Sequence, residues 1–201
     1  MENVILHEPR FLNEVIPIVV IPNFLSTKEC EAVINSLDLL DVVYAENEAF
    51  NVKNEISAKT FFLNFDNTRE LHNKVYSKIF EIARDNYKLK DVYTSEALYV
   101  SEYLKGGFRS LHADGGYMDK KINYPNEIVY KRMLSRKLTA VIQLSDKSTY
   151  DGGDLEIPYW TIPGDHTKQG SMILFPTSFL HQVSKVKSGI RYSLIAFACQ
   201  D

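Results

Sequence analysis

Residues 171–198 read SMILFPTSFLHQVSKVKSGIRYSLIAFA and carry the strongest structural signal in this 201-residue chain. The segment holds three short runs rich in β-branched and aromatic side chains, namely Ser171–Phe175, His181–Val186 and Arg191–Ala198. Turn-forming residues separate these runs, at Pro176-Thr177 and at Lys187-Ser-Gly189. Apolar runs of this length between such turns are typical of strands. The segment therefore predicts a core of β-structure.

The same pattern of short strand-like runs separated by turns begins at about residue 97. Three further strand-like runs precede the segment, namely Ala97–Leu104, Leu138–Leu144 and Asp154–Pro158. Glycine-containing turns separate them, at Lys105-Gly-Gly107 and Asp151-Gly-Gly153. Evenly spaced short strands with turns of this kind predict a sandwich or a barrel.

The first half of the chain has a different pattern. We expect a short strand within Ile16–Leu25, and Ser26 with Glu29 forms the sequence signature of a capping box at a helix start. A second helix is predicted over Arg69–Tyr87 from apolar residues at spacings of three and four. Helices followed by strands indicate an α+β chain with a mainly β core. We expect one domain over residues 1–201, with a helical N-terminal buttress over about 1–95 and the β core over about 96–201.

The composition is that of an ordinary globular protein. With 45% hydrophobic and 24% charged residues, it excludes collagen-like, low-complexity and coiled-coil chains. A formal net charge of −3 argues against electrostatic binding of the whole chain to nucleic acid or anionic membrane. Cys30 and Cys199 are too few for a disulfide scaffold, and we see neither a secretory signal nor a membrane-spanning apolar run. We therefore expect a cytoplasmic protein, as a monomer or a homodimer.

One connection is much longer than the others. Residues 115–137 form a 23-residue insertion between two strand-like runs, and long connections in compact domains are usually functional. Its stretch 117–137 holds six basic residues (Lys120, Lys121, Lys131, Arg132, Arg136 and Lys137) and two acidic ones (Asp119 and Glu127). We interpret the insertion as a lid that selects the substrate and excludes water. The alternatives are a plain solvated face, or a nucleic-acid groove in which bases stack on the interleaved tyrosines.

His112-Ala-Asp114 is the first sign of chemistry. Residues i and i+2 of an extended chain project to the same face, so this imidazole and this carboxylate can converge on one cation. His181, near the start of a late strand, supplies a third candidate ligand. Two histidines and one carboxylate on one face of a metal, with open positions opposite, are typical of non-haem Fe(II) oxygenases. The alternative is a structural histidine–carboxylate pair that holds no metal.

Arg191 follows His181 by ten residues, and the intervening turn predicts a hairpin that puts Arg191 on the strand next to His181. A guanidinium at this place would bind a carboxylate through two parallel hydrogen bonds. Ser193 shares the face of Arg191 and offers a hydroxyl donor. Tyr99 and Tyr103 share one face of an earlier strand and offer phenols, although core packing explains them equally well.

On these residues, the chain resembles the 2-oxoglutarate- and Fe(II)-dependent dioxygenases, and within them the prolyl-4-hydroxylase-like group. The resemblance covers most of residues 16–198. Its motifs are Ile21-Pro-Asn-Phe-Leu-Ser-Thr-Lys-Glu-Cys30, Glu102-Tyr-Leu-Lys-Gly-Gly107, His112-Ala-Asp114, Leu138-Thr-Ala-Val-Ile-Gln-Leu-Ser145, Tyr150-Asp-Gly-Gly-Asp-Leu155, Gly170-Ser-Met-Ile-Leu-Phe-Pro176, His181 and Gly189-Ile-Arg-Tyr-Ser193. The resemblance implies a double-stranded β-helix, or jelly-roll, with supporting N-terminal helices.

The resemblance also implies a chemistry. His112, Asp114 and His181 match the iron ligands, and Arg191 matches the basic residue that pairs with the distal carboxylate of 2-oxoglutarate. Tyr103 matches a tyrosine that often contacts the same cosubstrate. The implied cofactors are Fe(II), 2-oxoglutarate and O2, with ascorbate bound as reductant. The implied reaction is hydroxylation of an unactivated C–H bond, with succinate and CO2 as co-products.

The substrate that the resemblance implies is a prolyl residue of a peptide or protein. Two alternatives stay open. One is a non-catalytic protein that senses metal and 2-oxoglutarate. The other is a nucleic-acid-modifying oxygenase that would use the basic insertion. Against it, the AlkB-type demethylases of the same superfamily carry a second arginine six residues after the cosubstrate arginine, and that position here is Phe197.

Overall fold

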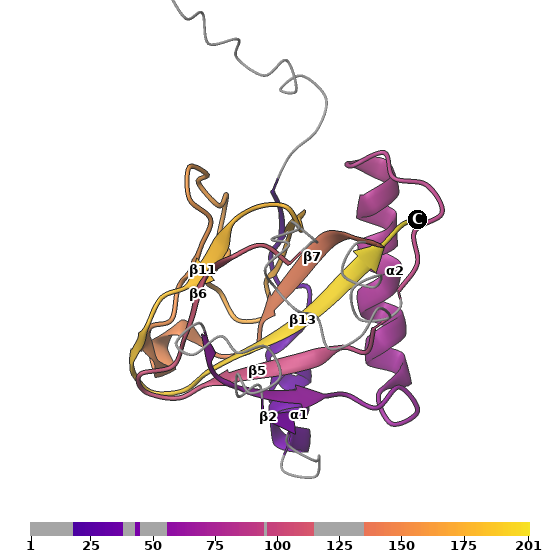
Figure 1. Ribbon diagram of the computed structural model, residues 1–201. Helices are drawn as coiled ribbons and strands as arrows, with labels where there is room; N and C mark the ends of the chain where they lie inside the picture. The colour runs from indigo at the N-terminus through magenta and orange to yellow at the C-terminus, as the bar shows by residue number, and fades with distance from the viewer. Residues whose placement is uncertain (1–17, 38–42, 45–55, 95, 115–134) are drawn as a thin grey trace, which may run out of the picture.

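A computed structural model describes residues 18–37, 43–44, 56–94, 96–114 and 135–201. Two main β-sheets face each other, and two helices cover the outer side of the larger sheet (Figure 1). This part of the chain is mainly β with helices near its start, which confirms the predicted class. Most of the predicted insertion, residues 115–134, lies outside the described residues. Its last residues, Arg136 and Lys137, begin a strand instead.

The larger sheet has seven strands in the order β1-β10-β7-β13-β5-β4-β2, and all neighbours are antiparallel. The strands are β1 Val19–Ile21, β2 Val43–Tyr44, β4 Lys59–Phe62, β5 Tyr99–Tyr103, β7 Arg136–Gln143, β10 Met172–Pro176 and β13 Arg191–Cys199. At the centre, β13 pairs with both β5 and β7, so that Ser193 lies opposite Ser101 on one side and Gln143 on the other.

The smaller sheet has four antiparallel strands in the order β3-β6-β11-β9, and a separate pair joins β12 to β8. The strands are β3 Ile56–Ser57, β6 Phe108–His112, β8 Asp151–Gly152, β9 Leu155–Glu156, β11 His181–Val183 and β12 Val186–Ser188, and a 3-10 helix spans Lys147–Thr149. The apolar pattern missed β6, because Arg109, Ser110 and His112 interrupt it.

The two helices are α1 (Thr27–Ser36) and α2 (Arg69–Asp85). The predicted capping box is present: Ser26 Oγ accepts a hydrogen bond from the Glu29 amide at 3.3 Å, and the Glu29 carboxylate accepts one from the Ser26 amide at 2.8 Å. Buried residues of both helices, including Cys30 and Ile79, form one core with the larger sheet. Neither helix of the described residues is long and apolar enough to cross a bilayer.

The two faces of β13 separate packing from chemistry. Leu194, Ala196 and Ala198 belong to the core that the helices cover. Because side chains alternate along a strand, Arg191 and Ser193 lie on the opposite face, toward the smaller sheet. Arg191 and Ser193 therefore point into the space between the two sheets.

The structure corrects the predicted path from His181 to Arg191. The expected strand His181–Val186 is two strands, since β11 ends at Val183 and β12 begins at Val186. Between them the chain leaves the smaller sheet, and the Val186 backbone bonds to Gly106 and Gly107. β13 then enters the larger sheet, between β5 and β7. The expectation that Arg191 lies on the strand next to His181 is therefore wrong, because the two residues belong to different sheets.

Candidate metal centre

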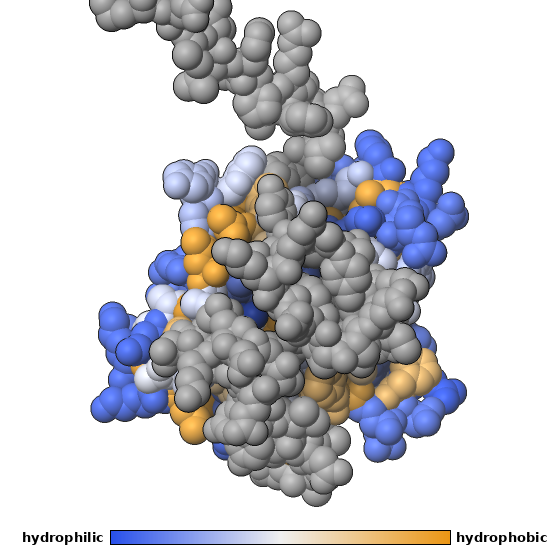
Figure 2. All heavy atoms as spheres, viewed as in Figure 1, coloured by the Kyte–Doolittle hydropathy of each residue, from blue (hydrophilic) through white to orange (hydrophobic). Residues whose placement is uncertain are grey.

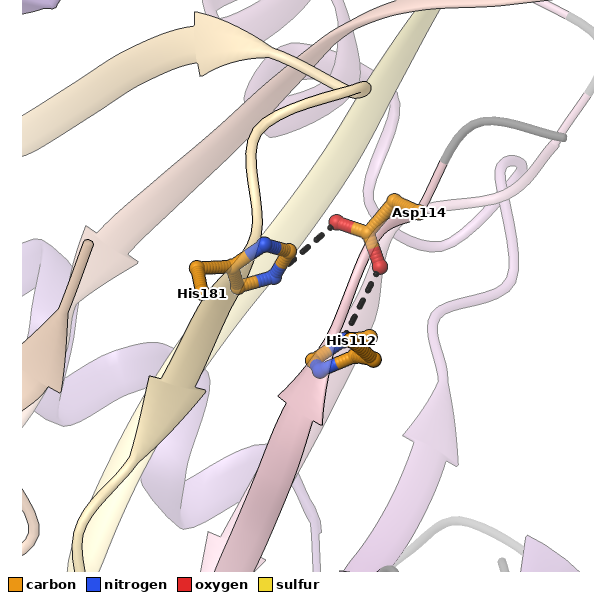
Figure 3. Close-up of side chains that lie close together, drawn as sticks. All are labelled: His112, Asp114 and His181. Carbon is orange, nitrogen blue, oxygen red and sulfur yellow. Dashed lines mark ion pairs between the residues drawn. The ribbon is translucent and has the colours of Figure 1, made fainter. Parts of the chain in front are cut away.

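The three predicted metal ligands lie together at the ends of β6 and β11 (Figure 3). His112 is directly opposite His181 in the antiparallel pair, and the two ring centroids are 4.2 Å apart. Asp114 follows the end of β6, and its two carboxylate oxygens lie 3.2 Å from His112 Nε2 and 3.3 Å from His181 Nε2. One possible ligand atom from each residue lies within 4.8 Å of the others. Strand pairing thus brings together residues far apart in sequence.

Backbone contacts fix which nitrogen each histidine presents to the carboxylate. His112 Nδ1 lies 2.8 Å from the carbonyl oxygen of Ser110, and His181 Nδ1 lies 3.0 Å from that of Phe179. A carbonyl oxygen only accepts, so each Nδ1 carries the hydrogen and donates it. In a neutral ring, Nε2 then keeps a free lone pair. A hydrogen bond from the second ring nitrogen is the usual way in which proteins orient a metal-binding histidine.

The carboxylate of Asp114 is also held in place. Thr139 Oγ1, on β7, donates a hydrogen bond of 2.8 Å to Asp114 Oδ2. The Asp114 backbone oxygen accepts a hydrogen bond of 3.3 Å from the Arg136 guanidinium. Arg136 also forms an ion pair with Glu96, and its guanidinium carbon lies 3.7 Å from the ring centroid of Phe197. Arg136, which falls within the predicted basic insertion, therefore supports the site and is not a solvated charge.

The charges of the site influence each other strongly. Burial alone would raise the pKa of Asp114, but attraction and hydrogen bonds from His181 and His112 hold that pKa well below its ordinary value. For His181, burial lowers the pKa, while the Asp114 carboxylate raises it, and the balance is a raised pKa. Asp114 is therefore anionic near neutral pH and attracts positive charge to the two Nε2 atoms.

The donor set fits a divalent first-row metal. Two imidazole nitrogens and one carboxylate on one side of a small space, with no thiolate, form the set that suits Fe(II) and leaves further coordination positions free. With two neutral imidazoles, a divalent ion and Asp114 would leave a net charge of +1, which favours an anionic ligand.

Arg191 forms a second polar centre on the facing sheet. Its side chain is 0% exposed, and its Nη2 donates a hydrogen bond of 2.9 Å to Gln143 Oε1. Its Nη1 lies 3.4 Å from Ser193 Oγ, while Nε has no hydrogen-bond partner in the structure. The guanidinium carbon is 5.4 Å from the ring centroid of Tyr103. Ser193 and Tyr103 thus lie beside Arg191.

Three nearby residues were not predicted. Thr139 and Gln143 alternate with apolar residues along β7 and read as ordinary strand positions in the sequence. Arg109 reaches the space between the two sheets because β6 contains an irregularity. Arg109 is opposite Val183 and His112 is opposite His181, so β6 has one more residue than β11 between these two pairs. Burial raises the pKa of the Tyr103 phenol, and the nearby Arg191, Ser101 and Arg109 offset only part of that rise. The sequence holds no periodic signal for such a bulge.

Two other histidines of the described part of the chain, His72 and His166, take no part in the centre. His72 is buried in the helical core, where its Nδ1 lies 2.9 Å from Thr68 Oγ1. His166 has a buried Nδ1 and is not among the residues that could share a metal. His7 lies outside the described residues.

A sequence model of the 2OG-Fe(II) oxygenase superfamily matches residues 98–199, which is just over half of the chain and includes all three candidate ligands and Arg191. The chain belongs to this superfamily. Fe(II) and 2-oxoglutarate are the cofactor and cosubstrate after which the family is named, as the sequence resemblance implied. The candidate metal centre fits that pair, because it offers three suitable donors and a buried guanidinium lies on the facing sheet.

Curated relatives of this chain include PKHD-type hydroxylases. One from Synechococcus sp. (strain CC9311) is 28% identical over 77% of this chain and 72% of the relative. One from Pseudoalteromonas atlantica is 36% identical over 45% of this chain and 37% of the relative. The matched stretch covers little more than a third of the first curated relatives.

Solved structures of similar shape include prolyl hydroxylases. The viral collagen prolyl hydroxylase of Paramecium Bursaria Chlorella virus-1, solved with 2-oxoglutarate, superposes with a TM-score of 0.65 at 18% identity, covering 91% of this chain and 96% of that one. A Pseudomonas putida prolyl-4-hydroxylase gives 0.66 at 14% identity, covering 92% and 93%. At this level of identity the likeness concerns the fold, and it confirms the jelly-roll that the sequence resemblance implied.

Proposed function

We propose that this chain is an Fe(II)- and 2-oxoglutarate-dependent dioxygenase that hydroxylates an unactivated C–H bond and releases succinate and CO2. The observation that carries the proposal is the convergence of His112 Nε2 and His181 Nε2 on the two oxygens of Asp114, with each Nδ1 tied to a backbone carbonyl. Such an arrangement leaves three donors free for one metal ion.

Each residue has a distinct role in this proposal. His112, Asp114 and His181 hold Fe(II), which when bound supplies the activation of O2 at the expense of 2-oxoglutarate. Arg191 binds the distal carboxylate of 2-oxoglutarate, and Ser193 and Tyr103 are the neighbouring donors. Thr139 orients Asp114 through its 2.8 Å hydrogen bond. Ascorbate serves as an external reductant in the reaction mixture.

A prolyl residue of a peptide or protein is the substrate class that we propose. PKHD-type hydroxylases are the matched relatives, and a prolyl hydroxylase of Trichoplax adhaerens with a bound peptide fragment is among the structures of the same fold. Figure 2 shows hydrophobic side chains among hydrophilic ones on the side of the molecule where β6 and β11 lie. Exposed apolar surface of this kind suits an uncharged substrate group such as a prolyl ring.

The test is an assay of succinate release with Fe(II), ascorbate, O2 and 2-oxoglutarate, in the presence of proline-containing peptides. We expect turnover by the natural chain, its loss in His112→Ala and His181→Ala, and a raised KM for 2-oxoglutarate in Arg191→Ala. A peptide that is hydroxylated gains one oxygen atom, which mass spectrometry detects. Normal turnover in the histidine variants would refute the metal site.

The same assay separates the alternative of a non-catalytic sensor. A sensor would bind metal and 2-oxoglutarate but would consume no O2 and form no succinate. We further propose that residues 1–201 form one domain and that the basic insertion, apart from the residues that belong to β7, selects the substrate. Both proposals rest on the sequence pattern.

A further inference from the structure

Gln143 is buried at the junction of three segments. It ends β7, is 2% exposed and lies opposite Ser193 of β13. Its backbone amide donates to Ser171, and its backbone oxygen accepts from Gly170 at 2.7 Å. The backbone at this position is therefore tied on both sides. The side chain extends from a fixed point toward Arg191, and its Oε1 accepts the 2.9 Å hydrogen bond from Nη2.

The partners of Arg191 are unusual for a buried charge. Among the described residues, its side chain is bonded to an amide oxygen and a hydroxyl, and no carboxylate forms an ion pair with it. A buried ion without a counter-ion is unfavourable, so proteins rarely retain one without a ligand that completes it. The unpartnered Nε shows that the guanidinium also has hydrogen-bonding capacity left.

We propose that Gln143 is a positioning residue for the cosubstrate: it orients the Arg191 guanidinium without neutralising its charge, so that the distal carboxylate of 2-oxoglutarate becomes the counter-ion. This inference rests on the proposed function. Arginine has donors only, so the amide of Gln143 turns its oxygen toward Nη2 and keeps its two N–H groups for other acceptors.

The chemistry explains why an amide suits this position. A glutamate of the same length would form a charged pair with Arg191 and compete with the ligand carboxylate. A methionine of similar size would leave the charge of Arg191 intact but remove the acceptor that fixes the orientation of its guanidinium. The two substitutions therefore separate charge from orientation at one buried site.

The experiment measures binding of N-oxalylglycine, a 2-oxoglutarate analogue, to the Mn(II)-loaded protein by isothermal titration calorimetry. Gln143→Glu should weaken binding by more than about 100-fold, because an internal carboxylate replaces the ligand. Gln143→Met should weaken it by about tenfold, the value of one hydrogen bond to a charged group. Asn73→Asp, the same change of charge on the exposed face of α2, should leave binding unchanged.

A melting curve of the metal-free protein gives a second readout. Gln143→Glu should have a melting temperature equal to or above that of the natural chain, because Arg191 gains a counter-ion. The same variant should nevertheless bind N-oxalylglycine weakly. In turnover assays, Gln143→Met should raise the KM for 2-oxoglutarate and leave kcat near normal at saturation. A purely structural role would instead lower the melting temperature of both variants and leave the affinity of the folded fraction unchanged.

The outcomes are separable. If the natural chain binds N-oxalylglycine and both Gln143 variants bind it equally well, the inference is wrong and the proposed function stands. If the natural chain with Mn(II) does not bind N-oxalylglycine at all, both are overturned. If Gln143→Glu does not fold, the affinity of Gln143→Met decides, and a normal affinity there refutes the role of Gln143.

Discussion

Asp114 connects the two histidines of the metal centre, since each of its oxygens faces one imidazole (Figure 3). The spacing of His112 and Asp114 made this pair predictable, because residues two apart on an extended chain share a face. Thr139 was not predictable, because a threonine on an apolar strand gives no sign of its partner until the register is known. Residue types thus reveal ligands more readily than they reveal the groups that orient the ligands.

Removing the hydroxyl that orients Asp114 should weaken metal binding. Thr139→Val keeps the shape of the side chain but removes the donor to Oδ2. Loss of a partner that orients a ligand typically lowers metal affinity by about 10–100-fold. The Kd for Mn(II) measures this directly. Thr60→Val, the same change at another buried strand position, is the matched control and should bind Mn(II) normally.

Metal binding should weaken in mild acid. Burial lowers the pKa of His181, but the Asp114 carboxylate raises it by more, so the net result is a raised pKa. In the metal-free protein, His181 therefore stays protonated to a higher pH than an ordinary imidazole. A metal ion must displace that proton, and its affinity therefore falls once the pH drops below the raised pKa. Asp114 stays ionised throughout, because its pKa is lowered. Titrations with Mn(II) from about pH 8 to about pH 5.5 measure the effect, and an affinity independent of pH would contradict it.

At the scale of elements, β13 and the turn after β8 together shape the surroundings of Arg191. The apolar pattern predicted β13 well, since its alternate residues pack under the helices. It could not predict which sheet β13 joins, because the turn around Gly189 is compatible with a hairpin to the preceding strand. The path depends on long-range backbone bonds of Val186 to Gly106 and Gly107, which leave no mark in local sequence.

Gly153 offers a test of this arrangement. A Cβ there would lie 3.0 Å from Arg191 Cδ and 2.9 Å from Val186 Cγ2, with φ at +62°. Gly153→Ala should therefore displace Arg191 and weaken binding of 2-oxoglutarate. Gly164 has the same φ of +62° but nothing within 4 Å of its added Cβ, so Gly164→Ala carries the backbone strain alone. Equal affinities in the two variants would show that Gly153 provides no room for Arg191.

The capping box should contribute to stability but not to ligand binding. Ser26→Ala removes the acceptor for the Glu29 amide and should lower the free energy of unfolding by about 1 kcal/mol. Hydrogen bonds from Lys74 and Ser26 lower the pKa of Glu29 from 4.5 to about 2, so its stabilising effect is present above the ordinary pKa and is lost progressively as the pH falls from 4.5 to about 2. Urea denaturation measures both effects. Ser77→Ala, on the exposed face of α2, should cost nothing.

At the scale of the whole molecule, the candidate site is built by two facing sheets: His112 and His181 belong to one of them, and Arg191 belongs to the other. Both sets of contacts exist only in the folded chain, so ligands should stabilise the fold. With Mn(II) saturating and 2-oxoglutarate at about 100 times its Kd, binding of 2-oxoglutarate should raise the free energy of unfolding by about 2.7 kcal/mol. For a chain of this size, Tm should then rise by roughly 5–10 °C. His181→Ala should show almost no rise, and an equal rise in that variant would place the ligands elsewhere.

A crystal structure of the natural chain with Mn(II) and 2-oxoglutarate tests the central claim most directly. We expect one anomalous peak bound by His112 Nε2, Asp114 and His181 Nε2, with the distal carboxylate of 2-oxoglutarate paired to the Arg191 guanidinium. A manganese ion bound elsewhere, or a 2-oxoglutarate molecule whose distal carboxylate avoids Arg191, would contradict the account.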